Sequence, residues 1–304
     1  MKCIVTGGAG FIGSHLVDQL IKKGYKTVVI DDLSAGKKEN LNPKADFYQL
    51  DICDFEKIKP LFKGVDYVFH LAAIPRVPVS IEDPVGTSKI NVLGTINVFK
   101  AAADNKIKKI VFASSSAVYG DQDKPLLKES MILNPKSPYG LQKLIGEQFA
   151  KLFVDIYKTP IVCLRYFNCY GPRIDFNSEY SLVLGRFLKL KKEGKPLTIF
   201  GSGNQMRAFC YVADVAEANI KAAESKKIKG GEIINIGHKK SYSINYLSRL
   251  IGGKIKYLPQ RQGDIFSSWA DITLAKKLLR WEPKYSLEQG LKETEKWFKD
   301  YKEI

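Results

Sequence analysis

Short apolar runs and longer amphipathic stretches alternate along the first half of the chain. The apolar runs have the length and composition of strands, and the amphipathic stretches have the spacing of helices. Strands are predicted at residues 2–6, 27–30, 46–50, 67–69, 109–114 and 160–167, and helices at 14–23, 55–62, 84–103 and 139–157. Because strands and helices alternate, we expect an α/β fold with a doubly wound parallel sheet.

The pattern changes from about residue 177, where helices interrupt short strands. Helices are predicted at 180–192, 212–224, 244–250, 272–279 and 287–301, and strands at 197–200 and 233–236. We therefore divide the chain into an α/β domain of residues 1–176 and a smaller, mainly C-terminal α/β cap of residues 177–304, with residues 210–238 expected to rejoin the first sheet. A cap is expected over the carboxyl ends of the strands, where open α/β sheets bind ligands.

Composition narrows the class of protein. The 304 residues are 45% hydrophobic, which suffices for a large core, and no apolar run reaches the 18 residues typical of a membrane span. The N-terminus leads directly into a predicted strand, so we expect neither a signal peptide nor a membrane partner. Five cysteines without paired spacing favour a reducing cytoplasm, and three scattered histidines argue against a metal site.

The formal net charge of +16 leaves two interpretations open. A basic surface can bind nucleic acid. The lysines are spread along the chain, however, so a solvated surface is the favoured interpretation, with no nucleic-acid partner. A positive field also suits an anionic small substrate. Arg207 and Arg261 lie near glycine-rich turns and are candidates to bind such an anion, although each alone is equally typical of a surface ion pair.

A glycine-rich turn joins the first predicted strand to the first predicted helix. Gly7, Gly10 and Gly13 fall in a turn that lets the backbone approach a pyrophosphate at the helix N-terminus. The next strand ends at Asp31, 24 residues after Gly7. A carboxylate there can accept hydrogen bonds from both ribose hydroxyls and repels a 2′-phosphate. The combination predicts a site for NAD rather than NADP.

A serine-rich loop and a downstream helix carry candidate chemistry. The run 114–120 follows a predicted strand, and Ser137 with Pro138 marks the start of the helix that holds Tyr139 and Lys143. Residues four apart share one helix face, so the lysine cation is expected to lower the pKa of the phenol and let it act as a base. Alone, this pair is also typical of an exposed helix face. The neighbouring serines and the glycine turn favour an active site.

With these residues in place, the sequence resembles the extended short-chain dehydrogenase/reductase superfamily and, within its NAD-dependent epimerase/dehydratase family, the UDP-glucose (UDP-N-acetylglucosamine) 4-epimerase group. The resemblance covers nearly the whole chain. It rests on Thr6–Gly13, Asp31–Gly36, Asp51–Ile52, His70–Ala73, Asn91–Thr95, Ser114–Gly120, Tyr139 with Lys143, Arg165–Asn168, and Gly263–Asp264 with Trp269–Asp271. It implies a Rossmann domain with a substrate-binding cap, a cytoplasmic enzyme and a homodimer formed through the long helices around Asn91 and Tyr139.

The resemblance also implies residue roles. Ser115, Tyr139 and Lys143 would be catalytic. The cofactor NAD would be bound by Gly7, Gly10, Phe11, Ile12, Gly13, Asp31, Asp32, Ser34, Gly36, Asp51, Ile52, Leu71, Ala72, Ala73, Tyr139, Lys143 and Phe167. The UDP-sugar would be bound by Ser80, Ser115, Tyr139, Asn168, Ser181, Leu182, Phe200, Arg207, Arg261, Asp264 and Ser268. A small residue at position 268 is similar to relatives that accept N-acetyl sugars as well as UDP-glucose and UDP-galactose.

One departure from related enzymes bears on the reaction. Sugar-nucleotide dehydratases and decarboxylases carry an acid just after the catalytic serine or threonine, whereas here Ser116 and Ala117 follow. Elimination of water would therefore lack its acid, which favours a 4-epimerase. Alternatives are a UDP-glucuronate 4-epimerase or another nucleotide-sugar reductase or dehydratase of this fold. A non-enzymatic NAD-sensing or nucleic-acid-binding protein is a more remote alternative.

Overall fold

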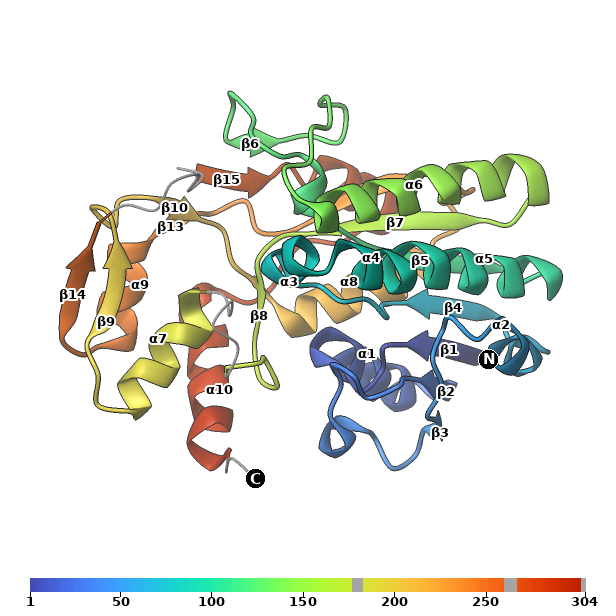
Figure 1. Ribbon diagram of the computed structural model, residues 1–304, viewed down its shortest axis with the longest axis horizontal. Coiled ribbons are helices and arrows are strands. Elements are labelled where there is room, and N and C mark those ends of the chain that lie inside the picture. Colours follow the sequence, from blue (N-terminus) through green and yellow to red (C-terminus); the bar gives the residue numbers. More distant parts are fainter. Residues whose placement is uncertain (177–182, 260–266, 302–304) are drawn as a thin grey trace.

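The computed structural model describes residues 1–176, 183–259 and 267–301. A parallel seven-stranded sheet forms its centre, in the order β12-β7-β5-β4-β1-β2-β3 (Figure 1). Its strands are β1 (Lys2–Thr6), β2 (Lys26–Ile30), β3 (Asp46–Tyr48), β4 (Tyr67–His70), β5 (Lys109–Ser115), β7 (Ile161–Tyr166) and β12 (Ile233–Ile236). The strand order reverses between β1 and β4, so the predicted doubly wound α/β sheet is confirmed.

Helices cover both faces of this sheet. Helices α1 (Phe11–Lys22) and α8 (Val212–Glu224) pack on one face, and α2 (Phe55–Ile58), α5 (Thr95–Asp104) and α6 (Pro138–Tyr157) pack on the other. Alternate residues of β1 face opposite layers: Val5 packs in the same buried cluster as Leu16 of α1, whereas Ile4 packs in the cluster that contains Phe99 of α5. The buried strands are accordingly apolar on both sides.

The helix predicted at residues 84–103 forms without a break, but its middle is π-helical. It consists of α4 (Pro84–Ser88), a π-helical segment (Lys89–Gly94) and α5, and the unpredicted helix α3 (Val77–Glu82) precedes it. The buried side chain of Asn91 lies in the wide turn. Its amide accepts a hydrogen bond from the N–H of Ile74 at 2.8 Å and donates to the Ile74 carbonyl at 3.1 Å and to Gln142 at 2.7 Å. The π turn therefore ties the loop after β4 to α6.

The remaining elements form small sheets and helices beside the main sheet. Strands β9 (Leu197–Phe200) and β14 (Ile255–Leu258) pair next to α7 (Val183–Lys192), α9 (Ile244–Ile251) and α10 (Leu287–Asp300), at the left of Figure 1. The other small strands are β6 (Leu126–Leu127), β8 (Cys169–Tyr170), β10 (Met206–Arg207), β11 (Cys210–Tyr211), β13 (Tyr242–Ser243) and β15 (Ser267–Ala270). Most of the helix predicted at 272–279 is a π-helical segment, Ala275–Leu279.

The domain division at residue 177 stays a prediction. Strand β12 lies in the main sheet beside β7, although it belongs to the second half of the chain. Conversely, two strands of the first half pair with strands of the second half: β6 pairs with β15, and β8 pairs with β11. The chain thus crosses between the two regions several times, and these crossings hold the smaller sheets close to the carboxyl ends of the main strands.

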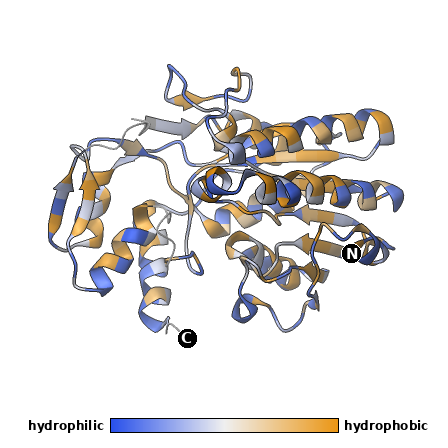
Figure 2. Cartoon of the chain, viewed as in Figure 1, coloured by the Kyte–Doolittle hydropathy of each residue, from blue (hydrophilic) through white to orange (hydrophobic). Residues whose placement is uncertain are grey.

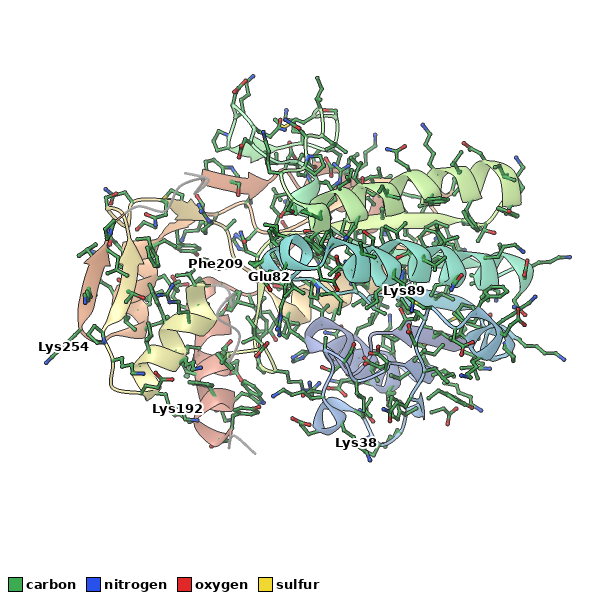
Figure 3. The ribbon with its side chains drawn as sticks, in the orientation of Figure 1. Lys38, Glu82, Lys89, Lys192, Phe209 and Lys254 are labelled. Atoms are coloured by element: carbon green, nitrogen blue, oxygen red, sulfur yellow. The ribbon has the colours of Figure 1, made fainter. Side chains whose placement is uncertain are left out.

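Hydropathy follows the layers, with apolar strands inside and polar helix faces outside (Figure 2). Lys38, Lys192 and Lys254 are exposed at separate edges of the molecule, so the positive charge is spread over the surface (Figure 3). Within the described ranges, no helical segment combines the length and apolar character of a membrane span. The same part of the chain contains no group of three or more His, Cys, Asp or Glu side chains arranged to bind a metal ion.

Candidate active site

A cavity of about 1110 Å³ lies at the carboxyl ends of the central strands, between the main sheet and the smaller sheets. This is the position at which open α/β sheets bind ligands. Most of the residues predicted from the sequence line it: Gly7, Gly10, Phe11, Ile12, Gly13, Asp31, Asp32, Ser34, Gly36, Asp51, Ile52, Leu71, Ala72, Ala73, Ser115, Tyr139, Lys143, Asn168, Arg207 and Ser268. The cavity therefore joins the glycine turn to the Ser115 loop in one continuous site.

Three predicted residues lie away from the cavity lining. Phe167 is 1% exposed and packs in the hydrophobic core. Phe200 lies on β9, where its ring contacts the guanidinium of Arg186. Ser80 is fully buried, and its hydroxyl accepts a hydrogen bond from the backbone N–H of Tyr139 at 3.0 Å. Ser80 thus supports the first turn of α6. Four further predicted residues, Ser181, Leu182, Arg261 and Asp264, lie outside the described residues.

The glycine turn has the shape of a cradle for a pyrophosphate. Gly7 has a positive φ of 73°, and a side chain there would come within 2.7 Å of the Ala72 nitrogen. A side chain at Gly13 would overlap the Gly7 carbonyl oxygen. The first amide groups of α1 have no partner inside the helix, and its first turn contains no acidic residue. The turn therefore leaves space and donors for an anionic group.

Asp31 directly follows β2 and lines the cavity beside the glycine turn. Its carboxylate accepts hydrogen bonds from the N–H groups of Ala9 and Leu33, both at 2.9 Å. Burial raises the pKa of this carboxyl group, and these two hydrogen bonds oppose the rise. The cradle, the carboxylate at the end of β2 and the small residues after β4 fit NAD, which Gly10, Gly13 and Asp31 would hold at its phosphates and ribose.

The N-terminus of α6 brings the catalytic candidates to the cavity. Ser137 caps the helix, its hydroxyl accepting from the N–H of Gly140 at 3.1 Å. A side chain at Gly140 would approach the Ala117 carbonyl oxygen to 2.7 Å, and one at Gly146 would approach the Phe112 ring to 2.6 Å. Glycine at both positions lets α6 pack closely on β5 and on the serine loop.

Tyr139 and Lys143 project from this helix as the spacing predicts. The structure does not, however, show the lysine lowering the pKa of the phenol, as the sequence led us to expect. The Lys143 ammonium lies over the Phe112 ring and donates a hydrogen bond to the Ala113 carbonyl oxygen at 2.8 Å. Burial raises the pKa of the Tyr139 phenol, and the neighbour that lowers it is the hydroxyl of Ser115. Helix spacing placed both side chains on one face, whereas packing on β5 directs the lysine to the strand.

The structure adds cavity residues that sequence reasoning missed. Arg76, in the loop after β4, forms an ion pair with Asp175 across 99 residues of sequence. Lys136 and Asp121 also line the cavity and approach each other to 3.7 Å. No local pattern marks these residues, because their proximity depends on loops that meet only in the folded chain.

Comparisons with known proteins agree with this geometry. The model of the NAD dependent epimerase/dehydratase family matches residues 3–237. The chain is 43% identical to the putative UDP-glucose 4-epimerase of Methanocaldococcus jannaschii, over 98% of each chain. Its structure is similar to that of the Thermotoga maritima UDP-glucose 4-epimerase with UDP-glucose, with a TM-score of 0.93, 39% identity and 99% coverage of both chains.

Other similar proteins differ in substrate or reaction. The Methanobrevibacter ruminantium UDP-N-acetylglucosamine 4-epimerase, in complex with UDP-N-acetylmuramic acid, has a TM-score of 0.93 and 41% identity over 98% of both chains. The Bacillus cereus UDP-glucuronic acid 4-epimerase, solved with its substrate and NAD, has a TM-score of 0.90 and 36% identity over 99% of both chains. A 35% identical relative from Bacillus cytotoxicus, over 98% of both chains, is a UDP-N-acetyl-alpha-D-glucosaminuronate decarboxylase. This chain is thus an NAD-dependent member of the NAD dependent epimerase/dehydratase family.

Proposed function

We propose that the protein is a 4-epimerase of UDP-hexoses. The observation that carries the proposal is the meeting of Ser115, Tyr139 and Lys143 on a cavity wall continuous with the glycine turn. The positions after Ser115 also line the cavity, and they are Ser116 and Ala117. Neither position holds a carboxylate that could assist elimination of water. The site therefore favours a reaction in which a proton and a hydride are removed at one carbon centre and then returned there.

In the proposed reaction the protein moves a proton and orients the sugar. Tyr139 takes the proton of the 4′-hydroxyl and later returns it, and the Ser115 hydroxyl holds the same oxygen. NAD, when bound, supplies hydride transfer at C4 in both directions. Arg207 and Asn168 would hold the UDP, which leaves the keto-sugar ring free to present its other face. Net redox is zero, so no cofactor is consumed.

The test is direct. Purified protein is incubated with UDP-glucose, UDP-galactose, UDP-N-acetylglucosamine and UDP-glucuronate without added NAD, and each product is identified by anion-exchange chromatography and NMR. We expect the 4-epimer of at least one hexose to accumulate to an equilibrium mixture. A 4-keto-6-deoxy product or released carbon dioxide would instead identify a dehydratase or decarboxylase. No conversion even with NAD supplied would contradict the proposal.

The proposed substrate range includes the N-acetyl sugars. Ser268 on β15 stands beside Arg207 on β10 in the register of the small sheet, and both residues line the cavity. If Arg207 holds the diphosphate, its neighbour is close to the sugar. A small side chain there leaves space for an acetamido group, which a closely packed wall would exclude.

UDP-glucuronate is the second candidate substrate. Lys136 lines the cavity next to Ser137, the residue that caps α6. Its ammonium is 3.7 Å from the Asp121 carboxylate and its side chain is 55% exposed, so it has room to reach another anion. A cation at this position would favour a sugar that carries a carboxylate. Lys136→Ala should then lower turnover of UDP-glucuronate and leave UDP-glucose turnover near the wild-type value.

We also propose that the chain forms a homodimer through α4, the π-helical segment and α6. This face exposes Val85, Leu93, Leu141, Leu152 and Ile156, with exposed fractions from 47% to 80%. A row of apolar side chains on adjacent helices is typical of an interface. Sedimentation should show a dimer, and Leu152→Glu with Ile156→Glu should give a monomer. Ile132→Glu, which alters an 86% exposed loop residue elsewhere, is the control.

A further inference from the structure

A third polar residue continues the catalytic face of α6 into the protein interior. Tyr139, Lys143 and Glu147 follow one another at intervals of four residues, and all three are buried. The Glu147 side chain has no exposed surface. The proton transfer described above uses Tyr139 and Ser115 and gives the glutamate no part. A buried carboxylate at this position calls for a physical explanation, since burial of a charge is costly unless it is compensated.

Glu147 is compensated by two partners on neighbouring strands. Arg165 of β7 donates from Nε to one carboxylate oxygen at 2.8 Å and from Nη2 to the other at 2.7 Å, and its side chain is only 1% exposed. The Ser114 hydroxyl of β5 donates to the same carboxylate at 2.6 Å. Glu147 and Arg165 thus form a buried, two-point ion pair. The same carboxylate holds Ser114, the residue before Ser115 on β5.

Other groups around Lys143 supply no negative charge at neutral pH. His70 of β4 faces it, and burial lowers the pKa of this imidazole to about 3, so the ring is neutral. Cys163 of β7 faces it too, and burial raises the pKa of this thiol well above its usual value, so the thiol is neutral. The Tyr139 phenol on the same helix carries no charge before the phenolate that takes the sugar proton forms, because burial raises its pKa.

Glu147 thus provides the opposite charge near Lys143. Burial lowers the pKa of the Lys143 ammonium to about 8, and Cys163 and, to a smaller extent, the Glu147 carboxylate act in the opposite direction. A lysine with a pKa one unit above the solution pH is about nine-tenths protonated, whereas one whose pKa equals the pH is about half protonated. The charge of Lys143 at neutral pH is therefore sensitive to its neighbours. Arg165 is a cation, so it does not stabilise the ammonium.

We propose that Glu147 is a positioning residue of the active site, which keeps the Lys143 ammonium charged and joins α6 to the end of β5 through Ser114. This inference rests on the proposed function of the same site. Glu147 has no exposed surface and does not line the cavity, so it would touch neither the sugar nor the cofactor. It acts through Lys143 and through β5, the strand that carries Ser115. A purely structural ion pair would stabilise the fold in the same way but would leave the titration of Lys143 unchanged.

The test separates these two roles by measuring the lysine itself. The protein is labelled with ¹³Cε-lysine, and the Lys143 signal is assigned by its loss in Lys143→Arg. In Glu147→Gln, which keeps an oxygen for Ser114 but removes the charge, we expect the pKa of Lys143 to fall on the order of one unit. The alkaline limb of kcat against pH should move in the same direction. Glu147→Asp should restore much of both values.

Arg165→Lys is the matched control. It keeps the positive charge but loses the two-point contact, so it should lower the thermal stability while leaving the Lys143 pKa near the wild-type value. If Glu147→Gln does not fold, the pair Glu147→Gln with Arg165→Gln removes both charges and leaves no orphaned ion. The Lys143 pKa should still lie below the wild-type value, because Glu147, unlike Arg165, is among the groups that act on Lys143.

An unchanged Lys143 pKa in the folded Glu147→Gln or double variant would overturn the proposal. The titration needs no sugar, so its result stands apart from the proposed reaction. Failure of the wild type to epimerise any UDP-sugar would contradict the proposed function alone, whereas an unshifted lysine in an active enzyme would contradict the role of Glu147 alone.

Discussion

The carboxylate of Asp31 accepts a hydrogen bond from the backbone N–H of Ala9 at 2.9 Å, so the end of β2 is bonded directly to the glycine turn after β1. The contact places the acid predicted to bind the ribose against the loop predicted to receive the pyrophosphate. A side chain at Gly36 would approach the same carboxylate to 2.8 Å, so the following loop also packs closely around it. The conformation of Asp31 and the shape of the glycine turn are therefore coupled.

Asp31→Ser should weaken the preference for NAD over NADP. The substitution removes the charge that repels a 2′-phosphate and the acceptor for the ribose hydroxyls. We expect the Kd for NAD to rise by roughly tenfold or more and the Kd for NADP to change little or fall, as measured by calorimetry on cofactor-free protein. Asp46→Asn on β3 makes a similar charge change away from the cavity. Tighter binding of NADP than NAD by the wild type would refute the role of Asp31.

Tyr139→Phe should leave the fold and NAD binding intact and slow epimerisation. The variant keeps the ring but removes the oxygen that exchanges a proton with the sugar, and general base catalysis contributes typically 10²–10⁴-fold. Turnover is measured with saturating UDP-hexose. Tyr119→Phe is the control, because the Tyr119 hydroxyl donates a hydrogen bond to the buried Asn235 side chain at 2.7 Å. Near wild-type turnover in Tyr139→Phe would remove this residue from the mechanism.

Acid should destabilise the protein in part through two histidines, the buried His70 and the partly buried His15. Burial lowers the pKa of His70 to about 3 and that of His15 to about 4, whereas an unfolded histidine titrates near 6.5. Between these values the unfolded chain binds more protons, so the contribution to stability is complete above pH 6.5 and is lost as the pH falls toward 3. Urea unfolding from pH 7 to pH 4.5 should show this slope, and His70→Gln should reduce it. An unchanged slope in the variant would contradict the assignment.

Ser268→Tyr should separate the two pairs of sugars. If Ser268 borders the C2 substituent, a tyrosine ring should abolish turnover of the N-acetyl sugars and leave UDP-glucose and UDP-galactose largely unaffected. Ser268→Ala, which keeps the side chain small, should retain both activities. Rejection of UDP-N-acetylglucosamine by the wild type, or its turnover by the tyrosine variant, would show that other walls set the size of the pocket.

Sequence alone was sufficient where a signal is local. Helix α8 (Val212–Glu224) and strand β12 (Ile233–Ile236) have the bounds that the sequence pattern predicts, because α8 is amphipathic and β12 is a short run buried in the main sheet. The glycine turn and Asp31 were recognised for a similar reason. A close approach of the backbone needs a glycine at one position, and the acid needs only a position directly after a strand, so both can be read from the sequence.

Tertiary structure alone decided the contacts between distant segments. Strands β6 and β10 contain two residues each, too few for any periodicity, and they exist because β15 pairs with both. The Lys143 ammonium turns to the Ala113 carbonyl because α6 packs on β5, which helix spacing cannot indicate. Glu147 and Arg165 each look like ordinary surface charges in sequence. Only the docking of α6 on β7 buries them as a pair, because the free energy of an ion pair depends on the solvent that folding removes.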